Sequence, residues 1–347
     1  MFFDISTRPN NRLPVHTKIG KWTLSTDLGW HVSLNKGEVV ASKGLFDNRC
    51  SINFQGDTWK LQTPTVRTFP LWSSTEGDRV TNCEAIDQKI HNFNRVSHDG
   101  TLNIEFNEPT WVRDMFLHKE YIDREDLRDK ICETIVAQAE LLPCHGLPIM
   151  VPNTGGVDTT LVRSILDYAG VMYETTVSKD NQSQTQQYVA DNFWGYQQMA
   201  DTTTAHIQVT GFWGDEYLQR NPLYTHLYLQ QFDKDITMAY DDRGQSYMRN
   251  FFDHHYREKI SQFDCTATPR LLLKDMMLND FQMWHIDECL TWTPLGDVEI
   301  LKLSLQATPD VAIDQCVNAG LSLSIIEYLN PHNLEIIDVN KNKRPTI

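Results

Sequence analysis

The chain has 347 residues, 40% hydrophobic and 22% charged, which is enough for two globular domains that each bury a core. Its formal net charge of −15 repels polyanions, so tRNA and DNA are disfavoured as partners. No apolar run reaches membrane-spanning length and the N-terminus lacks a long hydrophobic signal core, so we expect a cytoplasmic protein. The seven cysteines include no Cys-x-x-Cys pair, which argues against disulfide frameworks, zinc ribbons and iron–sulfur sites. We expect them to be buried.

Residues 1–115 are predicted to form a smaller, β-rich domain. Short, partly alternating runs are separated by Asn, Gly and Asp, a pattern typical of strands joined by turns. No motif in this part carries obvious chemistry. The predicted strands are 21–25, 37–41, 50–54, 66–72, 92–96 and 102–106.

Residues 116–347 are predicted to form an α/β domain with a helical C-terminal part. A helix capped by Asp123 and running to Leu142 precedes alternating strands and helices, which indicates a parallel sheet with helices on both faces. The predicted strands are 147–151, 171–177 and 206–210, and the helices between them are 158–169 and 183–199. Further helices are predicted at 223–232, 245–263, 269–284 and 311–329.

The stretch from Pro152 to Thr159 joins the first of these strands to a helix through a glycine-bearing loop. Gly155 and Gly156 let the backbone approach a ligand, and the amides at a helix N-terminus favour negative charge. Such a geometry binds phosphate groups. Asp158 or a neighbouring threonine is predicted to be the N-cap. A tight turn without a ligand is the alternative.

A second polar loop, Thr210 to Glu216, follows another predicted strand. Ligands of parallel sheets bind at the carboxyl ends of the strands, so Asp158 and Asp215 are expected to emerge at one edge. Two carboxylates there can hold Mg²⁺ against a triphosphate. Alternatively, Asp215 and Glu216 only cap the helix that follows.

Both loops resemble motifs of a known family. Thr154-Gly155-Gly156-Val157-Asp158-Thr159 resembles the Ser-Gly-Gly-x-Asp-Ser loop of ATP pyrophosphatases. Gly211, Asp215 and Glu216 resemble the Gly, Asp and Glu of the Gly-Glu-Gly-Ala-Asp-Glu motif of asparagine synthetases, with a different spacing after the first Gly. The segment 294–297 keeps the Pro and Asp of their Pro-Phe-Leu-Asp stretch. The resemblance spans residues 122–347 in order. It implies an asparagine synthetase-like domain with an ATP pyrophosphatase (adenine nucleotide alpha hydrolase-like) fold.

This resemblance implies that ATP lies across the first loop. Its pyrophosphate would be held by backbone amides and by the hydroxyls of Thr154 and Thr159, while Asp158 and Asp215 would ligate Mg²⁺. A late lysine, Lys343 or alternatively Lys341 or Lys274, would neutralise charge on the leaving pyrophosphate. The implied nucleotide-binding residues are Thr154, Gly155, Gly156, Val157, Asp158, Thr159 and Gly211, and the implied catalytic residues are Asp158, Asp215 and Lys343.

Several positions depart from the family pattern. Phe2 stands where asparagine synthetases carry the nucleophilic Cys of an N-terminal glutaminase, so no glutaminase activity is expected and residues 1–115 are at most a degenerate remnant of that domain. Phe212 replaces a Glu or Tyr that assists acyl transfer, and Leu290 replaces a glutamate. The nucleotide machinery is thus predicted to be kept and the acceptor machinery to be changed.

The resemblance therefore predicts an ATP-dependent ligase. It would activate a small-molecule carboxylate as an acyl-adenylate, release pyrophosphate and transfer the acyl group to an amine. Ammonia, another amine or a separate glutaminase would supply the nitrogen, and a homodimer is an option. One alternative is a catalytically altered protein of the same fold that binds nucleotide. Another is a nucleoside- or tRNA-modifying ATP pyrophosphatase, which the acidic charge disfavours.

Overall fold

The structure is a computed structural model of the full chain. It describes residues 3–11, 13–27, 29–35, 37–44, 50–62, 71–74, 78–82, 93–95, 104–105, 120–152, 155–176, 206–262, 290–335 and 337. The chain divides into two units, Met1–Arg113 with Glu258–Leu290 and Asp114–Arg257 with Thr291–Ile347. The sequence-based division at 115/116 differs in leaving 258–290 with the second part. Each unit is described by itself below.

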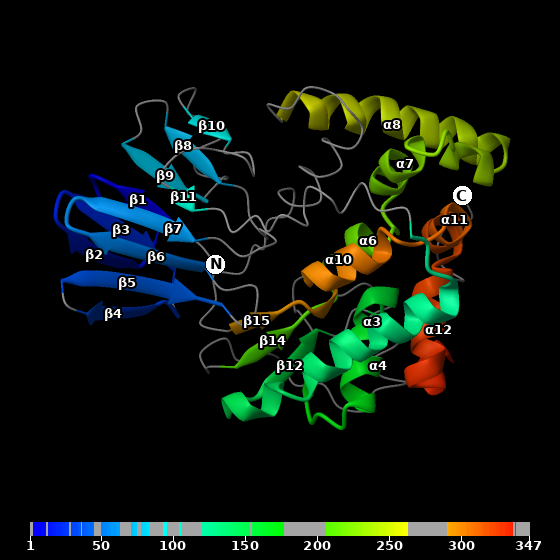
Figure 1. Ribbon diagram of the computed structural model, residues 1–347, viewed down its shortest axis with the longest axis horizontal. Coiled ribbons are helices and arrows are strands. Elements are labelled where there is room, and N and C mark those ends of the chain that lie inside the picture. The colour runs from blue at the N-terminus through cyan, green and yellow to red at the C-terminus, as the bar shows by residue number, and fades with distance from the viewer. Residues whose placement is uncertain are drawn as a thin grey trace. The chain divides into compact units, whose positions relative to one another are not determined.

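The first unit contains two β-sheets, one entirely antiparallel (Figure 1). The strand order of the first sheet is β10-β8-β9-β1-β3-β2. Its strands are β1 (Phe3–Ser6), β2 (Val15–Ile19), β3 (Trp22–Thr26), β8 (Trp72–Ser74), β9 (Arg79–Thr81) and β10 (Phe93–Arg95). Gly20 makes the β2–β3 turn at φ +58, a left-handed conformation that glycine adopts without steric cost.

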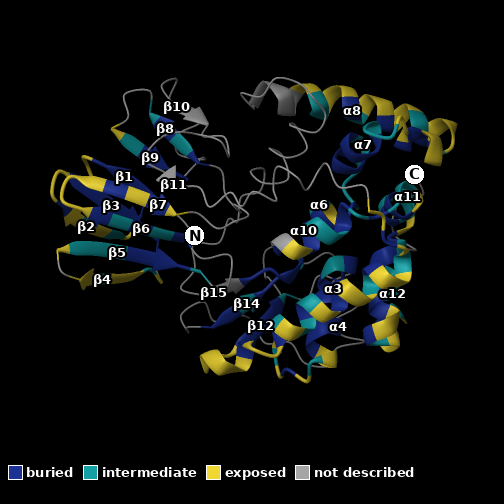
Figure 2. Cartoon of the chain, viewed as in Figure 1, coloured by how far each residue is buried: buried dark blue, intermediate teal, exposed yellow. Residues whose placement is uncertain are grey.

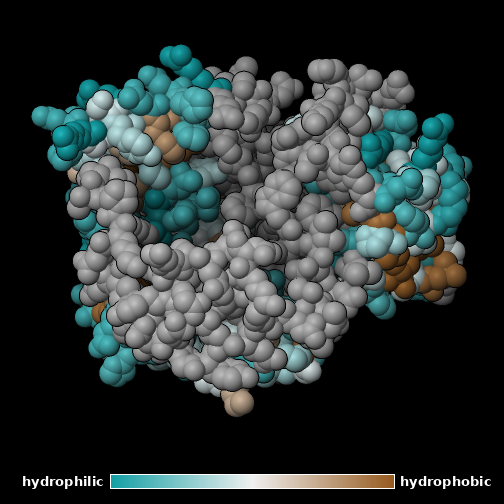
Figure 3. All heavy atoms as spheres, turned by 180° about the vertical axis from the view of Figure 1, so that it is seen from behind, coloured by the Kyte–Doolittle hydropathy of each residue, from teal (hydrophilic) through white to brown (hydrophobic). Residues whose placement is uncertain are grey.

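The second sheet has the order β11-β7-β6-β5-β4, and only β11 pairs in parallel. Its strands are β4 (His31–Asn35), β5 (Glu38–Lys43), β6 (Cys50–Gln55), β7 (Thr58–Gln62) and β11 (Ile104–Glu105). Burial alternates along β6 and β7, as expected for strands with one face on a core (Figure 2). The edge strand β4 instead exposes Val32 and Leu34. Figure 3 shows apolar surface at the right of the view and in smaller, separate areas elsewhere on that face.

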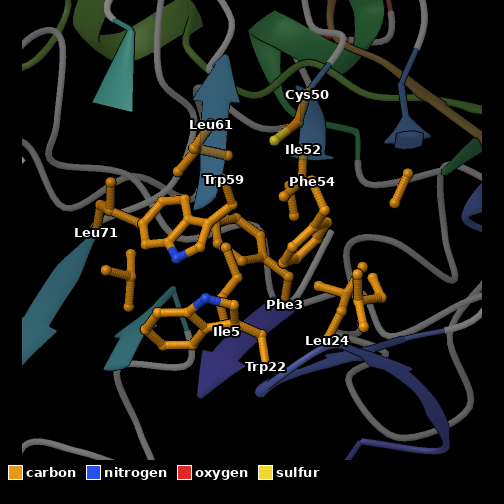
Figure 4. Close-up of a cluster of buried hydrophobic side chains, with 13 residues drawn as sticks. Phe3, Ile5, Trp22, Leu24, Cys50, Ile52, Phe54, Trp59, Leu61 and Leu71 are labelled. Atoms are coloured by element: carbon orange, nitrogen blue, oxygen red, sulfur yellow. The ribbon is translucent and has the colours of Figure 1, made fainter. Parts of the chain in front are cut away.

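Side chains from both sheets form the core of the first unit (Figure 4). Phe3 and Ile5 of β1 are fully buried, as are Ile52 and Leu61 from the other sheet. The indoles of Trp22 and Trp59 meet edge to face, with ring centroids 6.1 Å apart. Edge-to-face geometry places the positive ring edge against the negative face of its neighbour, which adds to the stabilisation from burial.

The second unit is built on a small sheet with the order β13-β12-β14-β15. β12 (Ile149–Pro152) pairs in parallel with β13 (Glu174–Thr176) and with β14 (Ile207–Val209). β15 (Leu290–Trp292) is the fourth strand, and the Thr210 amide just beyond β14 donates to the Trp292 carbonyl at 3.0 Å. The carboxyl ends of β12 and β14 therefore lie at the same edge of the sheet.

Helices accompany this sheet. α3 (Arg124–Ala139), α4 (Val157–Tyr168) and α12 (Gly320–Leu329) pack on one another, and α4 also contacts β12. The Asn333 side chain joins the group by donating to the buried Ser164 hydroxyl of α4 at 2.8 Å. The other α-helices in the described part of this unit are α6 (Gly214–Tyr217), α7 (Pro222–Gln230), α8 (Asp242–Gln262), α10 (Val298–Ser304) and α11 (Pro309–Asn318). Single 3-10 turns are η2 (Leu142–His145), η3 (Ile236–Ala239), η4 (Pro294–Gly296) and η5 (Pro331–Asn333).

The predicted class, a β-rich first part followed by parallel strands with helices, is confirmed in these coarse terms. The Asp123 cap is also confirmed, because its carboxylate accepts from the Asp126 amide at 2.9 Å. The prediction of a single helix over 311–329 is wrong. Ala319 adopts a left-handed conformation with φ +58 and separates α11 from α12. The predicted helices 183–199 and 269–284 and most of the predicted strand 66–72 lie outside the described residues.

Expectations drawn from composition hold in part. Cys50 and Cys132 are buried free thiols, and burial raises the pKa of Cys132 to about 12. Cys144 is exposed and Cys316 half-buried, so the expectation that all cysteines are buried is wrong. No helix within the described ranges is both long enough and apolar enough to cross a bilayer.

Candidate functional site

The first predicted loop does lead from a parallel strand to a helix N-terminus. Gly155 has φ +65, which favours glycine, and α4 begins at Val157. Gly156, in an extended conformation, is the N-cap, so the prediction of Asp158 or a threonine at that position is wrong. Asp158 instead lies in the first turn, where a negative charge is favoured by the helix dipole.

The second predicted loop lies directly against Asp158. A Cβ atom added to Gly211 would come within 2.7 Å of the Asp158 carbonyl carbon and of the Thr159 nitrogen. A Cβ on Gly214 would overlap the carboxyl group of Asp158. Both positions therefore need glycine because the loop after β14 touches the first turn of α4. This contact brings together the ends of two neighbouring parallel strands.

The carboxylates of Asp158 and Asp215 converge on a single cation, Arg220. One nitrogen of its guanidinium, Nη1, lies 2.7 Å from Oδ1 of Asp158 and 3.4 Å from Oδ1 of Asp215. The Arg220 side chain is only 9% exposed, compared with 20% for Asp158 and 55% for Asp215. The expectation that the two aspartates emerge together is thus confirmed. Arg220 was absent from the sequence-based prediction.

Backbone geometry carries Arg220 back to this position. Gln219 has φ +62, and the amides of Arg220 and Asn221 both donate to the carbonyl of Asp215, the former at 2.8 Å. The Asn221 side chain then caps α7 by accepting from the Leu223 amide at 3.0 Å. The chain therefore reverses between α6 and α7, and the reversal holds Arg220 beside Asp215.

Charge and burial act together on Arg220. Burial alone would lower the pKa of its guanidinium, but the negative charges of Asp158 and Asp215 outweigh that effect and raise it. Burial, with the nearby charges of Asp215 and Asp158, also raises the pKa of Glu216 to about 7. Among the described residues, this site thus brings three acidic side chains together with the guanidinium of Arg220, and the pKa of Glu216 is raised toward neutral pH.

Two residues of this region adopt left-handed backbone conformations that are rare outside glycine. They are Trp213, at φ +74, and Gln219. Trp213 is 1% exposed and packs on Tyr217 with ring centroids 4.8 Å apart. The side-chain amide of Gln219 is also buried, and neither its oxygen nor its nitrogen has a hydrogen-bond partner among the described residues. Strained backbone and unsatisfied buried polar groups recur at functional sites.

The segment 294–297, which resembles Pro-Phe-Leu-Asp, packs against the site. A Cβ on Gly296 would come within 2.6 Å of the Trp213 ring, so η4 packs closely against that indole. Asp297 caps α10 by accepting from the Glu299 amide at 2.7 Å, and it also accepts from the Gln138 side chain. The motif that resembles Pro-Phe-Leu-Asp is therefore used here in capping and packing.

The remaining predicted residues divide into two groups. Gly155, Gly156, Val157 and Thr159 lie at the start of α4 beside Asp158, and Gly211 lies against that turn. Thr154 and the lysines Lys274, Lys341 and Lys343 lie outside the described residues, so their roles stay predictions.

A magnesium ion between Asp158 and Asp215 does not fit this arrangement. The carboxylate oxygens have the right chemistry for Mg²⁺, but the point at which they converge holds the guanidinium of Arg220. Nowhere in the described part do three or more His, Cys, Asp or Glu side chains gather as a metal site. The predicted metal remains a sequence-based expectation, and no chemical step is assigned to it.

Comparison with known proteins adds no assignment. No family model matches the chain, and no curated protein sequence is detectably similar to it. The likeness to asparagine synthetases therefore stands on the motifs alone. What the geometry adds is that two of those motifs meet in space.

Proposed function

We propose that this protein is an ATP-dependent adenylating ligase that activates a carboxylate and transfers it to an amine. The proposal depends on one observation: Asp158, in the first turn of the helix after a glycine turn, meets the loop that ends the neighbouring parallel strand. A ligand at that edge would face helix amides and the guanidinium of Arg220. In this proposal the fold is that of ATP pyrophosphatases, with helices on both faces of the sheet.

The nucleotide would lie with its phosphates over the start of α4. Backbone groups of Gly155, Gly156 and Val157 would bind the phosphates, with the hydroxyls of Thr154 and Thr159 as further donors. Lys343 would neutralise charge that develops on pyrophosphate as it leaves. Fixed dipoles and charges of this kind stabilise a transition state without reorganisation, which makes them the main catalytic contribution in phosphoryl and nucleotidyl transfer.

The reaction would proceed in two substitutions. A carboxylate oxygen of the substrate attacks the α-phosphorus of ATP, the bond to the bridging oxygen breaks, and pyrophosphate leaves with that electron pair. An amine then attacks the acyl carbon, AMP leaves, and the ammonium proton is lost to solvent. Ammonia, another amine or a separate glutaminase would supply the nitrogen. These partners, and a cytoplasmic location, belong to the proposal.

Exchange of labelled pyrophosphate into ATP tests the first step. The full chain should catalyse this exchange with at least one member of a panel of small carboxylates. Asp158→Ala should abolish the exchange because Arg220 would lose the carboxylate that holds it at the start of α4. Asp310→Ala is a matched control, because Asp310 is also an acidic residue in the first turn of a helix in the same unit but is exposed at the start of α11. Exchange that survives Asp158→Ala would refute the assignment.

A non-catalytic nucleotide-binding protein is the second candidate. Arg220 already pairs with both aspartates, and Phe212, at a position where asparagine synthetases and β-lactam synthetases use Glu or Tyr, cannot transfer a proton. ATP binding that depends on Asp158, without pyrophosphate exchange for any carboxylate in the panel, would favour this reading over the enzyme.

A further inference from the structure

The space between Asp158 and Asp215 is held by a cation that belongs to the chain. Nη1 of Arg220 is within hydrogen-bonding distance of Asp158 Oδ1 and within ion-pair distance of Asp215 Oδ1. A magnesium ion bound to the same two oxygens would sit about 2.0–2.1 Å from each. It would then lie next to the guanidinium, and the two positive charges would repel each other.

Hydrogen bonds also hold the backbone of Arg220 in place. Its amide donates to the Asp215 carbonyl at 2.8 Å, and its carbonyl accepts from the thiol of Cys316 at 3.7 Å. With its side chain 9% exposed, moving the guanidinium away would break a largely buried ion pair. Separating such a pair is costly because each charge loses its partner without becoming fully hydrated.

Glu216 does not change this picture. The charges of Asp215 and Asp158 contribute to raising its pKa. Its Oε1, however, accepts a hydrogen bond from the side-chain amide of Asn221 at 3.5 Å. The three carboxylates do not form a group that could hold a metal within the described residues. A third acid is therefore present without completing a coordination site.

We propose that Arg220 takes the place of a divalent cation between Asp158 and Asp215, so that these two carboxylates bind no metal in the native protein. The inference concerns the same site as the proposed function, but it rests only on the geometry of these three side chains. Its test needs no nucleotide and no turnover, so failure of the ligase proposal would leave its outcome readable.

Manganese serves as the probe because the free ion gives an electron paramagnetic resonance signal that is lost on binding. Titration of Mn²⁺ into the full-length protein should show no tight site that depends on Asp158. Arg220→Gln should create one, with binding at least about tenfold tighter than in the native chain. Adding Asp158→Asn to that variant should remove the new site.

Controls separate this effect from a general change in charge or from misfolding. Arg124→Gln removes the same positive charge from a more exposed pair with Asp314, and it should bind Mn²⁺ like the native protein. A tight site in the native chain that Asp158→Asn abolishes would overturn the proposal, as would a folded Arg220→Gln variant with no new site. If Arg220→Gln does not fold, the comparison of native protein with Asp158→Asn decides: equal Mn²⁺ binding supports the proposal.

Discussion

Gly214→Ala tests the contact on which the site depends. The added methyl group would overlap the carboxyl group of Asp158, so either α6 shifts or the Asp158 side chain swings away from Arg220. Overpacking a tight site or separating a largely buried ion pair costs about 2–3 kcal/mol, and the better helix propensity of alanine offsets about 1 kcal/mol. We expect the free energy of unfolding to fall by about 1–2 kcal/mol.

The functional effect should exceed what that loss of stability explains. ATP binding, measured by calorimetry on folded protein, should be lost because the carboxylate and guanidinium no longer meet at the start of α4. Gly170→Ala is the matched control. Gly170 has φ +66 and no atom within 4 Å of the place that an added methyl group would take, so the substitution costs about 1–2 kcal/mol of backbone strain without touching the site. Native stability and native ATP binding in Gly214→Ala would refute the packing argument.

Three further predictions concern metal, pH and packing. If ATP binds at the start of α4 beside Arg220, EDTA should change its dissociation constant by less than about threefold, whereas a metal-bridged site would lose binding. Burial lowers the pKa of His226 in the folded state below its ordinary value of 6.5, so below pH 6.5 the unfolded chain binds more protons than the folded chain. The free energy of unfolding should therefore fall as pH falls from 6.5 toward the folded-state pKa, by up to about 1.4 kcal/mol per pH unit. Urea unfolding from pH 5 to 8 should show a weaker pH dependence of this free energy for His226→Gln. Tyr228→Phe removes a buried hydroxyl that donates to the Ala307 carbonyl at 2.6 Å, and it should cost about 1–3 kcal/mol in the same assay while ATP binding stays unchanged.

The elements that the sequence predicted well have a clear periodic pattern. In α3, the residues Leu127, Ile131 and Ile135 are buried at helical spacing, and a run of apolar residues marks the central strand β12. The convergence of Asp158 and Asp215 followed from topology alone, because neighbouring parallel strands end at one edge.

The errors occur where one residue's backbone conformation decides the path. Nothing in the pattern of 311–329 marks Ala319 as left-handed. The nearest signal in the sequence is Gly320. The structure shows why glycine is needed there, because a Cβ at that position would overlap the Asp314 carboxylate. The N-cap of α4 was misassigned for a similar reason. Asp158 suits a cap by residue type, but the glycine turn places Gly156 there and leaves Asp158 in the first turn of the helix.

Arg220 was missed because its position beside the two aspartates depends on a chain reversal that the residue types do not predict. The signal available was a lone arginine five positions after Asp215 and just before the helix start at Asn221-Pro222. Only the left-handed Gln219 and the two amides that donate to the Asp215 carbonyl turn that arginine back toward the acids.

The same reversal explains how the guanidinium of Arg220 can keep a divalent metal ion from solution out of the space between the two aspartates. A guanidinium held a few residues from Asp215 is always present at its site, whereas a divalent ion must be captured from solution and must give up some of its bound water. Two carboxylates at the end of parallel strands are therefore insufficient to predict a metal. The residues that follow the second carboxylate must also leave the space between them open, and in this chain they place Arg220 there.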